Sequence, residues 1–566
     1  MRSVLSWSDK IPERDGSKST VWDIAFKPDG SQMVVAVGNR VLVYDAVDGD
    51  LLHSLKGHKD TVYCVDYSRD GKRFASGGAD NTIIIWTSKA DGILKYSHNE
   101  SIQRLAYNPV TAQLASCTAN DFGLWSPEQK SVVKHKMGSK ILSCCWTNDG
   151  QYLTLGLFSG QISIRDKSGD EKVSIERKAP IWCLQWCPSQ DEPVDVLAVG
   201  CWDQTLSFYQ LSGVQHGKDR RLGFDPCSVA YFSNGEYIVI GGADRKVTLW
   251  TKEGVKLTNV AELDDWVWCA KPRPNQHYVA IGCNSGSLMM QQLIFSTVHG
   301  LYQDRYAYRE FMTDVIVQHL ITEQKVRIKC RDYVKKIAVY RDRLAVQLPD
   351  RAIVYELAQD DPYNTNMHYR VREKIYKPLE CNLLVVTSLH LILCQERKLQ
   401  LYNFQGRKER EWVLESVIRY IKVVGGPAGR EGLLVGLKNG AVLKIFVDNP
   451  FPILLIKQDT SIRCLDLSGA FAERGAGRKA EGERESDRSR GRDRDRDKGA
   501  ETQAERTRQT LTGGERNAVL EGGRAGWKER EREREMQRQL RIPAYTTSTA
   551  FTCTYASHAP PVCIFI

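Results

Sequence analysis

Three side chains near the start of the chain are of the types that build a serine hydrolase triad: His58, Ser76 and Asp80. In such a triad the imidazole takes the proton of the serine hydroxyl, and the carboxylate orients the imidazole. Ser76, however, lies inside an apolar run, and no G-x-S-x-G pattern surrounds it. A buried aspartate needs hydrogen-bond donors, and a histidine, a serine and the indole N–H of Trp86 supply them. We therefore predict a structural hydrogen-bonded network here and no catalytic residue.

A second set of the same types occurs forty residues later. It contains His98, Ser116 and Trp125, with Asn120 or Asp121 as the acidic or amide partner. The following repeat ends at Ile164–Asp166 and lacks the set. We expect the same structural network in the second set and no such network in the following repeat.

The remaining candidates for chemistry are the cysteines and one glycine-rich loop. None of the 16 cysteines forms a CxxC pair, so the spacing indicates neither a zinc site nor a redox motif. The loop Val424–Gly432 lies between two apolar runs and lacks the phosphate-loop pattern and a following helix. We predict an intracellular protein with no metal, no cofactor and no enzymatic activity, whose cysteines are buried and reduced.

The elements that would position these residues repeat at a fixed period. Each repeat opens with two apolar residues three positions apart, and early openings are 41, 40, 39 and 40 residues apart. The pairs are Val21/Ile24, Val62/Val65, Ile102/Leu105, Ile141/Cys144, Ile181/Leu184 and Val267/Ala270, with a further unit near Cys227–Tyr231. Asp-Gly or Asn-Gly turns separate the apolar runs at Gly30, Gly71, Gly150 and Gly235. This period is typical of WD-type blades. It predicts a seven-bladed WD40 β-propeller over residues 1–300, with Val4–Trp7 as the outer strand that closes the ring.

A weaker strand pattern follows. Asp314–Ile321 and Lys325–Cys330 resemble a hairpin, and three units follow at Lys335–Leu357, Leu379–Phe404 and Ile418–Val447. Ser461–Gly469 reads like the opening of another blade, with Ile462 and Leu465 in the expected places. The pattern predicts an incomplete second β-propeller over residues 301–468, of about three units and a fragment. The fold class is thus predicted to be all-β.

Residues 469–566 differ in composition from everything before them. Arg, Glu and Asp dominate and apolar residues are scarce, so the segment is predicted to be a disordered low-complexity tail. Two interpretations stay open. The first is a non-homologous end, produced by alternative splicing or a faulty gene model. The second is an RNA-processing tail, because Arg-Asp and Arg-Glu repeats resemble those of some splicing proteins. Cys563–Ile566 has the outline of a prenylation box, which we interpret as a chance match.

Charge and hydropathy limit the partners of the chain. The 79 basic and 69 acidic residues nearly balance, so no concentrated basic stripe indicates a nucleic-acid partner. No apolar stretch approaches the length of a membrane span, and the first residues lack the apolar core of a signal peptide. We therefore expect neither nucleic-acid binding nor a direct membrane span.

The amino-acid sequence of several segments resembles that of the intraflagellar transport protein 122 family, and the resemblance covers residues 1–468. These segments are Ser296–Cys330, Gly57–Asp80, Asp121–Lys136 and Gly429–Gly440. The resemblance implies a subunit of intraflagellar transport complex A that acts in retrograde ciliary transport and cilium assembly. It also implies roles in the ciliary entry of membrane receptors and in restraining Hedgehog (smoothened) signalling.

The implied partners are the other complex A subunits and ciliary membrane-protein cargo adaptors. The implied location is the cytoplasm and the cilium, with its basal body and axoneme. Family members resemble tandem propellers followed by a long helical solenoid, which this sequence lacks. We therefore expect the chain to assemble only weakly with complex A. The alternative is a WD-repeat scaffold of a vesicle coat or of an RNA-processing complex.

A candidate protein-binding face follows from a recurring aromatic position. The residue after the opening apolar position is aromatic in four repeats: Trp22, Tyr63, Trp182 and Trp268. In a propeller this part of the innermost strand lies near one rim of the central channel, and aromatic residues are favoured interface anchors. Packing between blades is the alternative role for these side chains.

Overall fold

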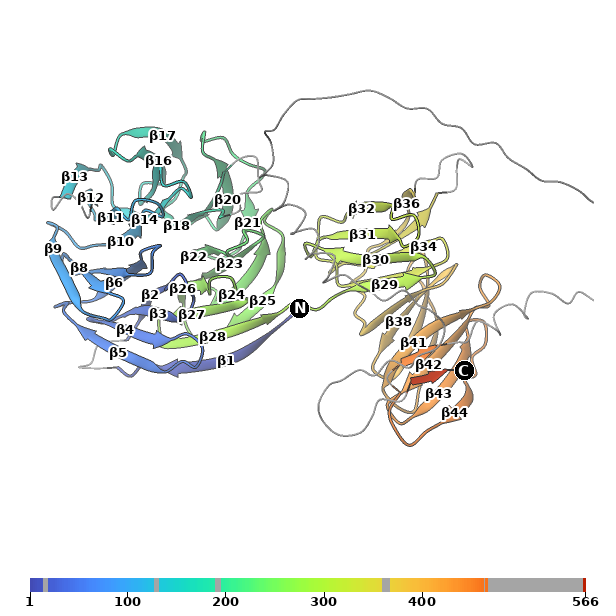
Figure 1. Ribbon diagram of the computed structural model, residues 1–566. Helices are drawn as coiled ribbons and strands as arrows, with labels where there is room; N and C mark the ends of the chain where they lie inside the picture. The colour runs from blue at the N-terminus through green and yellow to red at the C-terminus, as the bar shows by residue number, and fades with distance from the viewer. Residues whose placement is uncertain are drawn as a thin grey trace, which may run out of the picture. The chain divides into compact units, whose positions relative to one another are not determined.

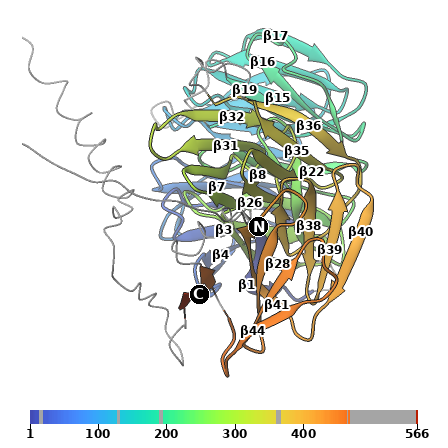
Figure 2. The ribbon, with the colours of Figure 1, turned by 90° about the vertical axis from the view of Figure 1, so that its right-hand side faces the viewer.

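The computed structural model describes residues 1–13, 19–126, 132–188, 195–358, 367–462, 464–466 and 563–565. These residues form β-strands joined by turns and loops, and no α-helix occurs among them (Figures 1 and 2). Eleven four-stranded antiparallel sheets account for nearly all the strands. In the described part of the chain, no helix is long and apolar enough to cross a membrane. The all-β prediction is therefore confirmed.

The first seven sheets follow one another along the chain, as blades of one propeller. The first contains β2 (Val21–Phe26), β3 (Gln32–Val37), β4 (Arg40–Asp45) and β5 (Leu51–Lys56), and the second β6 (Val62–Tyr67), β7 (Arg73–Gly78), β8 (Thr82–Thr87) and β9 (Gly92–Ser97). The third contains β10 (Arg104–Tyr107), β11 (Leu114–Cys117), β12 (Asp121–Trp125) and β13 (Val132–Lys136), and the fourth β14 (Ile141–Trp146), β15 (Tyr152–Leu157), β16 (Gln161–Asp166) and β17 (Glu171–Glu176).

The ring continues with three further sheets. The fifth contains β18 (Ile181–Trp186), β19 (Val196–Cys201), β20 (Thr205–Gln210) and β21 (Arg220–Arg221), and the sixth β22 (Pro226–Tyr231), β23 (Tyr237–Gly242), β24 (Lys246–Thr251) and β25 (Lys256–Glu262). The seventh combines β26 (Val267–Pro272), β27 (Tyr278–Cys283) and β28 (Ser287–Ile294) with the N-terminal β1 (Arg2–Lys10). The seven-bladed propeller is confirmed.

The first strand closes the ring. β1 pairs antiparallel with β28, from Arg2 opposite Ile294 to Lys10 opposite Ser287, and Figure 1 shows the two strands side by side. The predicted outer strand at Val4–Trp7 is therefore correct, although the strand is longer than predicted. Because the seventh sheet takes its fourth strand from the start of the chain, the first and last blades are joined and the sheet edge at the seam is paired.

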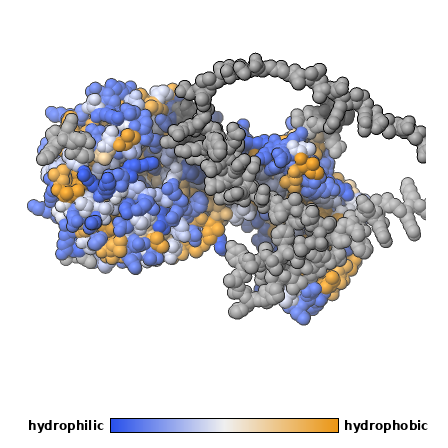
Figure 3. Space-filling view, viewed as in Figure 1, coloured by the Kyte–Doolittle hydropathy of each residue, from blue (hydrophilic) through white to orange (hydrophobic). Residues whose placement is uncertain are grey.

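Apolar residues fill the space between consecutive sheets. Between the first two blades, Val34 of β3 packs with Val62 of β6 and with Phe74 of β7. The sheets come so close that Gly77 has no room for a side chain. A Cβ atom there would lie 2.5 Å from Ile102 Cγ2 of the next blade. The edge strands instead face solvent, and Figure 3 shows a mostly hydrophilic surface with small separate hydrophobic patches over the described residues.

The hairpin turns lie where the sequence predicts them. The glycines of the four Asp-Gly and Asn-Gly pairs have φ values of 72°, 67°, 65° and 71°. This left-handed conformation costs glycine little because it has no Cβ atom. The turns thereby fix the register between the two innermost strands of each of these blades.

Residues 299–457 form four further sheets of the same kind. The first contains β29 (His299–Tyr302), β30 (Arg305–Glu310), β31 (Asp314–His319) and β32 (Lys325–Lys329), and the second β33 (Lys336–Tyr340), β34 (Arg343–Gln347), β35 (Ala352–Leu357) and β36 (Tyr369–Ile375). The third contains β37 (Leu383–Val386), β38 (His390–Gln395), β39 (Lys398–Asn403) and β40 (Lys408–Val413), and the fourth β41 (Ile418–Gly425), β42 (Gly432–Leu437), β43 (Ala441–Phe446) and β44 (Ile453–Lys457). Two short strands, β45 (Cys464–Asp466) and β46 (Cys563–Phe565), complete the set.

Four complete sheets correct the predicted count of three units and a fragment. The additional strands are β29 and β30, which lie in the segment that reads as a linker. Their residues are largely polar or aromatic, and most are only half-buried, so the apolar alternation that marks a strand is weak there. The hairpin predicted at 314–330 is present as β31 and β32.

The prediction that another blade opens after Ser461 is supported up to residue 466. Ile462 and Leu465 are buried, and the backbone N–H of Ile462 donates to the carbonyl of Leu437 at 3.2 Å. Gly436 packs against Ile462 in the same way as Gly77 packs against Ile102. A Cβ atom at Gly436 would also lie 2.5 Å from the Cγ2 atom of the isoleucine. The predicted tail at 469–566 lies outside the described residues, apart from β46. The domain boundaries at 300 and 468 remain predictions.

Candidate functional site

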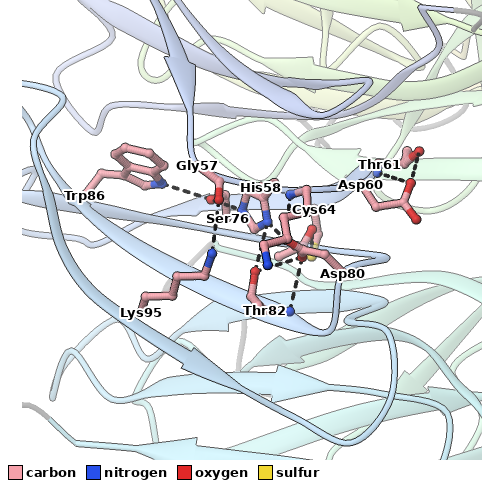
Figure 4. A network of polar contacts seen from close by, with 12 residues as sticks. Gly57, His58, Asp60, Thr61, Cys64, Ser76, Asp80, Thr82, Trp86 and Lys95 are labelled. Atoms are coloured by element: carbon pink, nitrogen blue, oxygen red, sulfur yellow. Dashed lines mark hydrogen bonds and ion pairs between the residues drawn. The ribbon is translucent and has the colours of Figure 1, made fainter.

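The structure brings His58, Ser76, Asp80 and Trp86 together in the second blade (Figure 4). His58 precedes β6, Ser76 lies on β7, Asp80 follows β7 and Trp86 lies on β8. The Trp86 indole N–H donates to Ser76 Oγ at 2.9 Å, and this oxygen lies 2.8 Å from His58 Nε2. His58 Nδ1 lies 3.0 Å from Asp80 Oδ1. The backbone N–H of Lys59 donates to the other carboxylate oxygen at 2.9 Å, so both oxygens are engaged.

These contacts fix the direction of each hydrogen bond. Because Asp80 can only accept, His58 Nδ1 carries the proton and Nε2 accepts from the Ser76 hydroxyl. Burial lowers the pKa of His58 against the opposing effect of Asp80, so the imidazole is neutral near pH 7. Burial would raise the pKa of Asp80, but hydrogen bonds from the Lys59 backbone, His58 and Thr82 hold it below its usual value. Ser76 is fully buried, so no substrate reaches its hydroxyl, and the geometry is that of a structural network.

The third blade repeats only part of this arrangement. His98 Nδ1 lies 3.0 Å from Asp121 Oδ1, and His98 Nε2 lies 2.8 Å from Ser116 Oγ. Asp121, and not Asn120, is therefore the partner. Ser116 Oγ also lies 3.2 Å from the carbonyl oxygen of Gly123. No hydrogen bond between Trp125 and Ser116 occurs within the described ranges, and the Trp125 ring packs in the core between the second and third blades.

Arg177 joins strands of the fifth blade in a way that the repeat pattern did not reveal. Its guanidinium pairs with Asp203 at 2.8 Å and with Asp219 at 3.0 Å. It also donates to the hydroxyls of Thr205 and Tyr209 at 2.8 and 3.1 Å. Arg177 lies between two blades in the sequence, and its carboxylate partners are 26 and 42 residues away, so no short motif indicates the cluster.

The four predicted aromatic residues meet at one end of the first propeller. The Trp22 ring lies 5.4 Å from the Tyr63 ring and 5.1 Å from the Trp268 ring, between ring centroids. Trp268 in turn lies 5.7 Å from Trp182. Two tryptophans that the recurring position did not indicate extend the group, because Trp202 stacks on Trp182 at 4.3 Å and Trp266 lies 5.6 Å from Trp268. We call these six residues the aromatic platform.

The platform lies where the innermost strands of blades one, two, five and seven begin. All six side chains are half-buried or exposed, and Trp266 is 36% exposed. Trp182 and Trp268 also line a cavity of about 410 Å³ that follows the innermost strands. The rings contact one another and still reach solvent, so the geometry is compatible with packing between blades and with a binding face. The binding face stays a prediction.

One carboxylate is fixed beside the platform by a polar relay. Asp265 Oδ1 accepts the backbone N–H of Trp266 at 2.8 Å, and Asp265 Oδ2 accepts from Asn284 Nδ2 at 2.7 Å. The carbonyl oxygen of the same Asn284 side chain accepts the indole N–H of Trp268 at 3.3 Å and the hydroxyl of Thr20 at 3.2 Å. The carboxylate is thus only two hydrogen bonds away from a platform ring.

Polar side chains inside the cavity join neighbouring blades. Asp23 of the first blade accepts the Val65 backbone N–H of the second at 3.3 Å, and Asp66 accepts the Tyr107 backbone N–H of the third at 2.6 Å. Gln185 accepts the Tyr231 backbone N–H at 2.8 Å. Burial raises the pKa of Asp66 to about 7, although the backbone hydrogen bonds oppose the shift. The side chains of Asp23, Asp66 and Gln185 therefore form hydrogen bonds between neighbouring blades of the ring.

The cysteines form no metal site in the part of the chain that the structure describes. No group of three or more histidine, cysteine, aspartate or glutamate side chains there could hold a metal ion. Burial raises the pKa of thiols such as Cys64 and Cys269 well above the usual value, so they are poor nucleophiles. The Cys269 thiol lies 3.8 Å from the Val21 carbonyl oxygen, across the seam of the ring.

Comparison with known proteins agrees with this architecture. The family model described as IFT122 first beta-propeller matches residues 20–292, and the one described as IFT122 second beta-propeller matches residues 299–473. The intraflagellar transport protein 122 homolog of Xenopus tropicalis is 65% identical over 474 residues, which cover 83% of this chain and 40% of the relative. The homolog of Danio rerio is 65% identical over 472 residues, with the same coverage. The human homolog is 56% identical over 533 residues, which cover 83% of this chain and 42% of the relative.

The chain therefore spans about 40% of the length of the relatives that it matches. Both family models match the chain in the order of its two series of sheets, and together they cover nearly all the described residues. On this evidence the chain belongs to the intraflagellar transport protein 122 family.

Proposed function

We propose that the protein is a non-enzymatic scaffold and cargo-adaptor subunit of intraflagellar transport complex A. The observation that carries this proposal is family membership across both series of sheets. The chemistry of the site is consistent with it. The triad-like groups of the second blade are buried in a closed hydrogen-bonded network. What the first propeller offers to solvent is a set of aromatic rings, which suits binding better than catalysis.

In this role the protein acts in retrograde ciliary transport and cilium assembly. It also supports the ciliary entry of membrane receptors and the negative regulation of Hedgehog signalling. Its partners are the other subunits of complex A and ciliary membrane-protein cargo adaptors. It works in the cytoplasm, at the ciliary basal body and along the axoneme. Residues 1–300 and 301–468 are the two propeller domains of this scaffold, and residues 469–566 are a low-complexity tail.

Disruption of the gene in ciliated cells tests the transport role. We expect retrograde traffic to stall and transported material to accumulate at ciliary tips, with reduced receptor entry. Normal cilia with normal receptor entry after complete loss would refute the proposal.

Purification of the tagged chain from the same cells tests the partners. We expect other complex A subunits to be recovered with the chain. Recovery of vesicle-coat or RNA-processing proteins in place of complex A subunits would assign the scaffold to another assembly.

A further inference from the structure

The aromatic platform combines two features that together select a partner. It presents several adjoining π-faces, and carboxylates flank it in the loops from which its rings project. Asp60 lies three residues before Tyr63, and Asp265 directly precedes Trp266. Asp225 directly precedes Pro226, whose carbonyl oxygen accepts the indole N–H of Trp202 at 3.2 Å. Aromatic faces with carboxylates in the same loops favour a cation over an anion or a neutral apolar group. Basic side chains also occur in this region, with Lys59 directly before Asp60 and with Arg104 and Lys271 in the cavity that Trp182 lines.

Asp60 and Asp265 have no counter-ion among the residues that the structure describes. Asp60 accepts the backbone N–H and hydroxyl of Thr61, at 2.7 and 3.3 Å. Asp265 is held by Trp266 and Asn284, as described above. Within the ranges that the structure describes, neither carboxylate forms an ion pair with a lysine, arginine or histidine. Other acids nearby are already neutralised, since Asp203 pairs with Arg177 and Asp264 lies 3.6 Å from Lys10.

Asp60 and Asp265 belong to the two blades that neighbour the blade of Trp22. Asp265 belongs to the seventh blade, next to Trp268, and Asp60 precedes the second blade, next to Tyr63. Trp22 of the first blade lies between them and contacts both rings. The two carboxylates therefore come from the loops that lead into the rings on either side of Trp22 in blade order.

We infer that the aromatic platform binds an arginine side chain presented by a protein partner. A guanidinium is planar, so it stacks on an indole while its edge N–H groups donate to carboxylates, which a lysine ammonium cannot do at the same time. This inference rests on the proposed role of the chain as a partner-binding scaffold and specifies the chemistry of that binding. The partner is a folded or extended protein segment, because the carboxylates of Asp60 and Asp265 disfavour the phosphates of nucleic acid and of anionic membrane surfaces.

Fluorine NMR of the full chain labelled with fluorotryptophan tests the inference. The probe is a short Gly/Ser peptide with one central arginine, titrated beside the same peptide with citrulline, lysine or glutamate at the centre. Citrulline keeps the shape of arginine but removes its charge. We expect the arginine peptide to shift the signals of Trp22 and Trp268, with the citrulline peptide about tenfold weaker. The signal of Trp412, in the second series of sheets, is the internal reference for unspecific effects.

Substitution of the two carboxylates, Asp60 and Asp265, is the second test of the inference. In Asp60→Asn/Asp265→Asn, the arginine peptide should bind about five- to tenfold more weakly, because the two charges are removed while the side-chain shape is kept. The control Asp91→Asn carries a comparable change in the turn between β8 and β9 and should bind as the unchanged chain does. Equal binding of the citrulline or lysine peptide, tighter binding of the glutamate peptide, or no shift at the platform would each overturn the inference.

The outcome separates this inference from the proposed function. If the arginine peptide fails to bind while complex A subunits are still recovered with the chain, the platform assignment is wrong and the scaffold role stands. If the peptide binds as expected but complex A subunits are not recovered, the chemistry of the platform stands and its place in complex A is wrong.

Discussion

Replacing Asp80 with alanine should weaken the second blade through stranded hydrogen-bond donors. The carboxylate accepts from His58, from the Lys59 backbone and from the hydroxyl and backbone N–H of Thr82. Lys59 is exposed and Thr82 is half-buried, so water can replace the lost acceptor for these two. The His58 side chain is only 1% exposed, so its Nδ1 proton loses its main acceptor. One buried donor left without a partner costs about 1–3 kcal/mol.

Hydrogen exchange of the full chain, followed by mass spectrometry, measures this cost where it arises. Slow backbone amides of β6, β7 and β8 should exchange about 5- to 150-fold faster in Asp80→Ala, which corresponds to about 1–3 kcal/mol. Amides of the distant sixth blade should change less. The matched control Asp91→Ala removes an exposed aspartate from the next turn and should leave exchange unchanged. Unchanged exchange of the second blade in Asp80→Ala would show that the network does not stabilise it.

Three further variants test other contacts, two in the first propeller and one in the second series of sheets. The pKa of Asp66 is raised to about 7, so the folded protein binds a proton that the unfolded chain releases near pH 4, and this contribution to stability is lost as the pH rises through 7. The melting temperature of Asp66→Asn relative to the unchanged chain should therefore rise between pH 5 and pH 8, and a pH-independent difference would contradict the shift. Gly77→Ala should destabilise the chain by about 1–3 kcal/mol in thermal unfolding, because its Cβ atom would overlap Ile102; an unchanged melting temperature would contradict this close packing. Arg343→Met should speed exchange in β34 and β35, because the buried guanidinium bridges Asp342, Glu356 and the Ser388 carbonyl; unchanged exchange there would show that the bridge contributes nothing.

Features that depend on near neighbours in the chain were predictable from the sequence. The strand period, the tight turns at Gly30 and Gly71 and the closing strand follow from apolar alternation and turn chemistry, which act over a few residues. The grouping of His58, Ser76 and Asp80 was predictable because one blade holds all three. The strands β29 and β30 were missed because their polar and aromatic residues hide the alternation.

Only the closed ring decides which residues from different blades meet. Trp22 and Trp268 are far apart in the sequence, and their rings lie 5.1 Å apart because β1 and β28 join the last blade to the first. The relay from Asp265 through Asn284 to Thr20 also crosses this seam. No local pattern encodes these distances, since they follow from the number and packing of the blades. The sequence by itself determined the blades of the first propeller and the residues of its His58 network, and the tertiary structure brought the aromatic rings of four blades together.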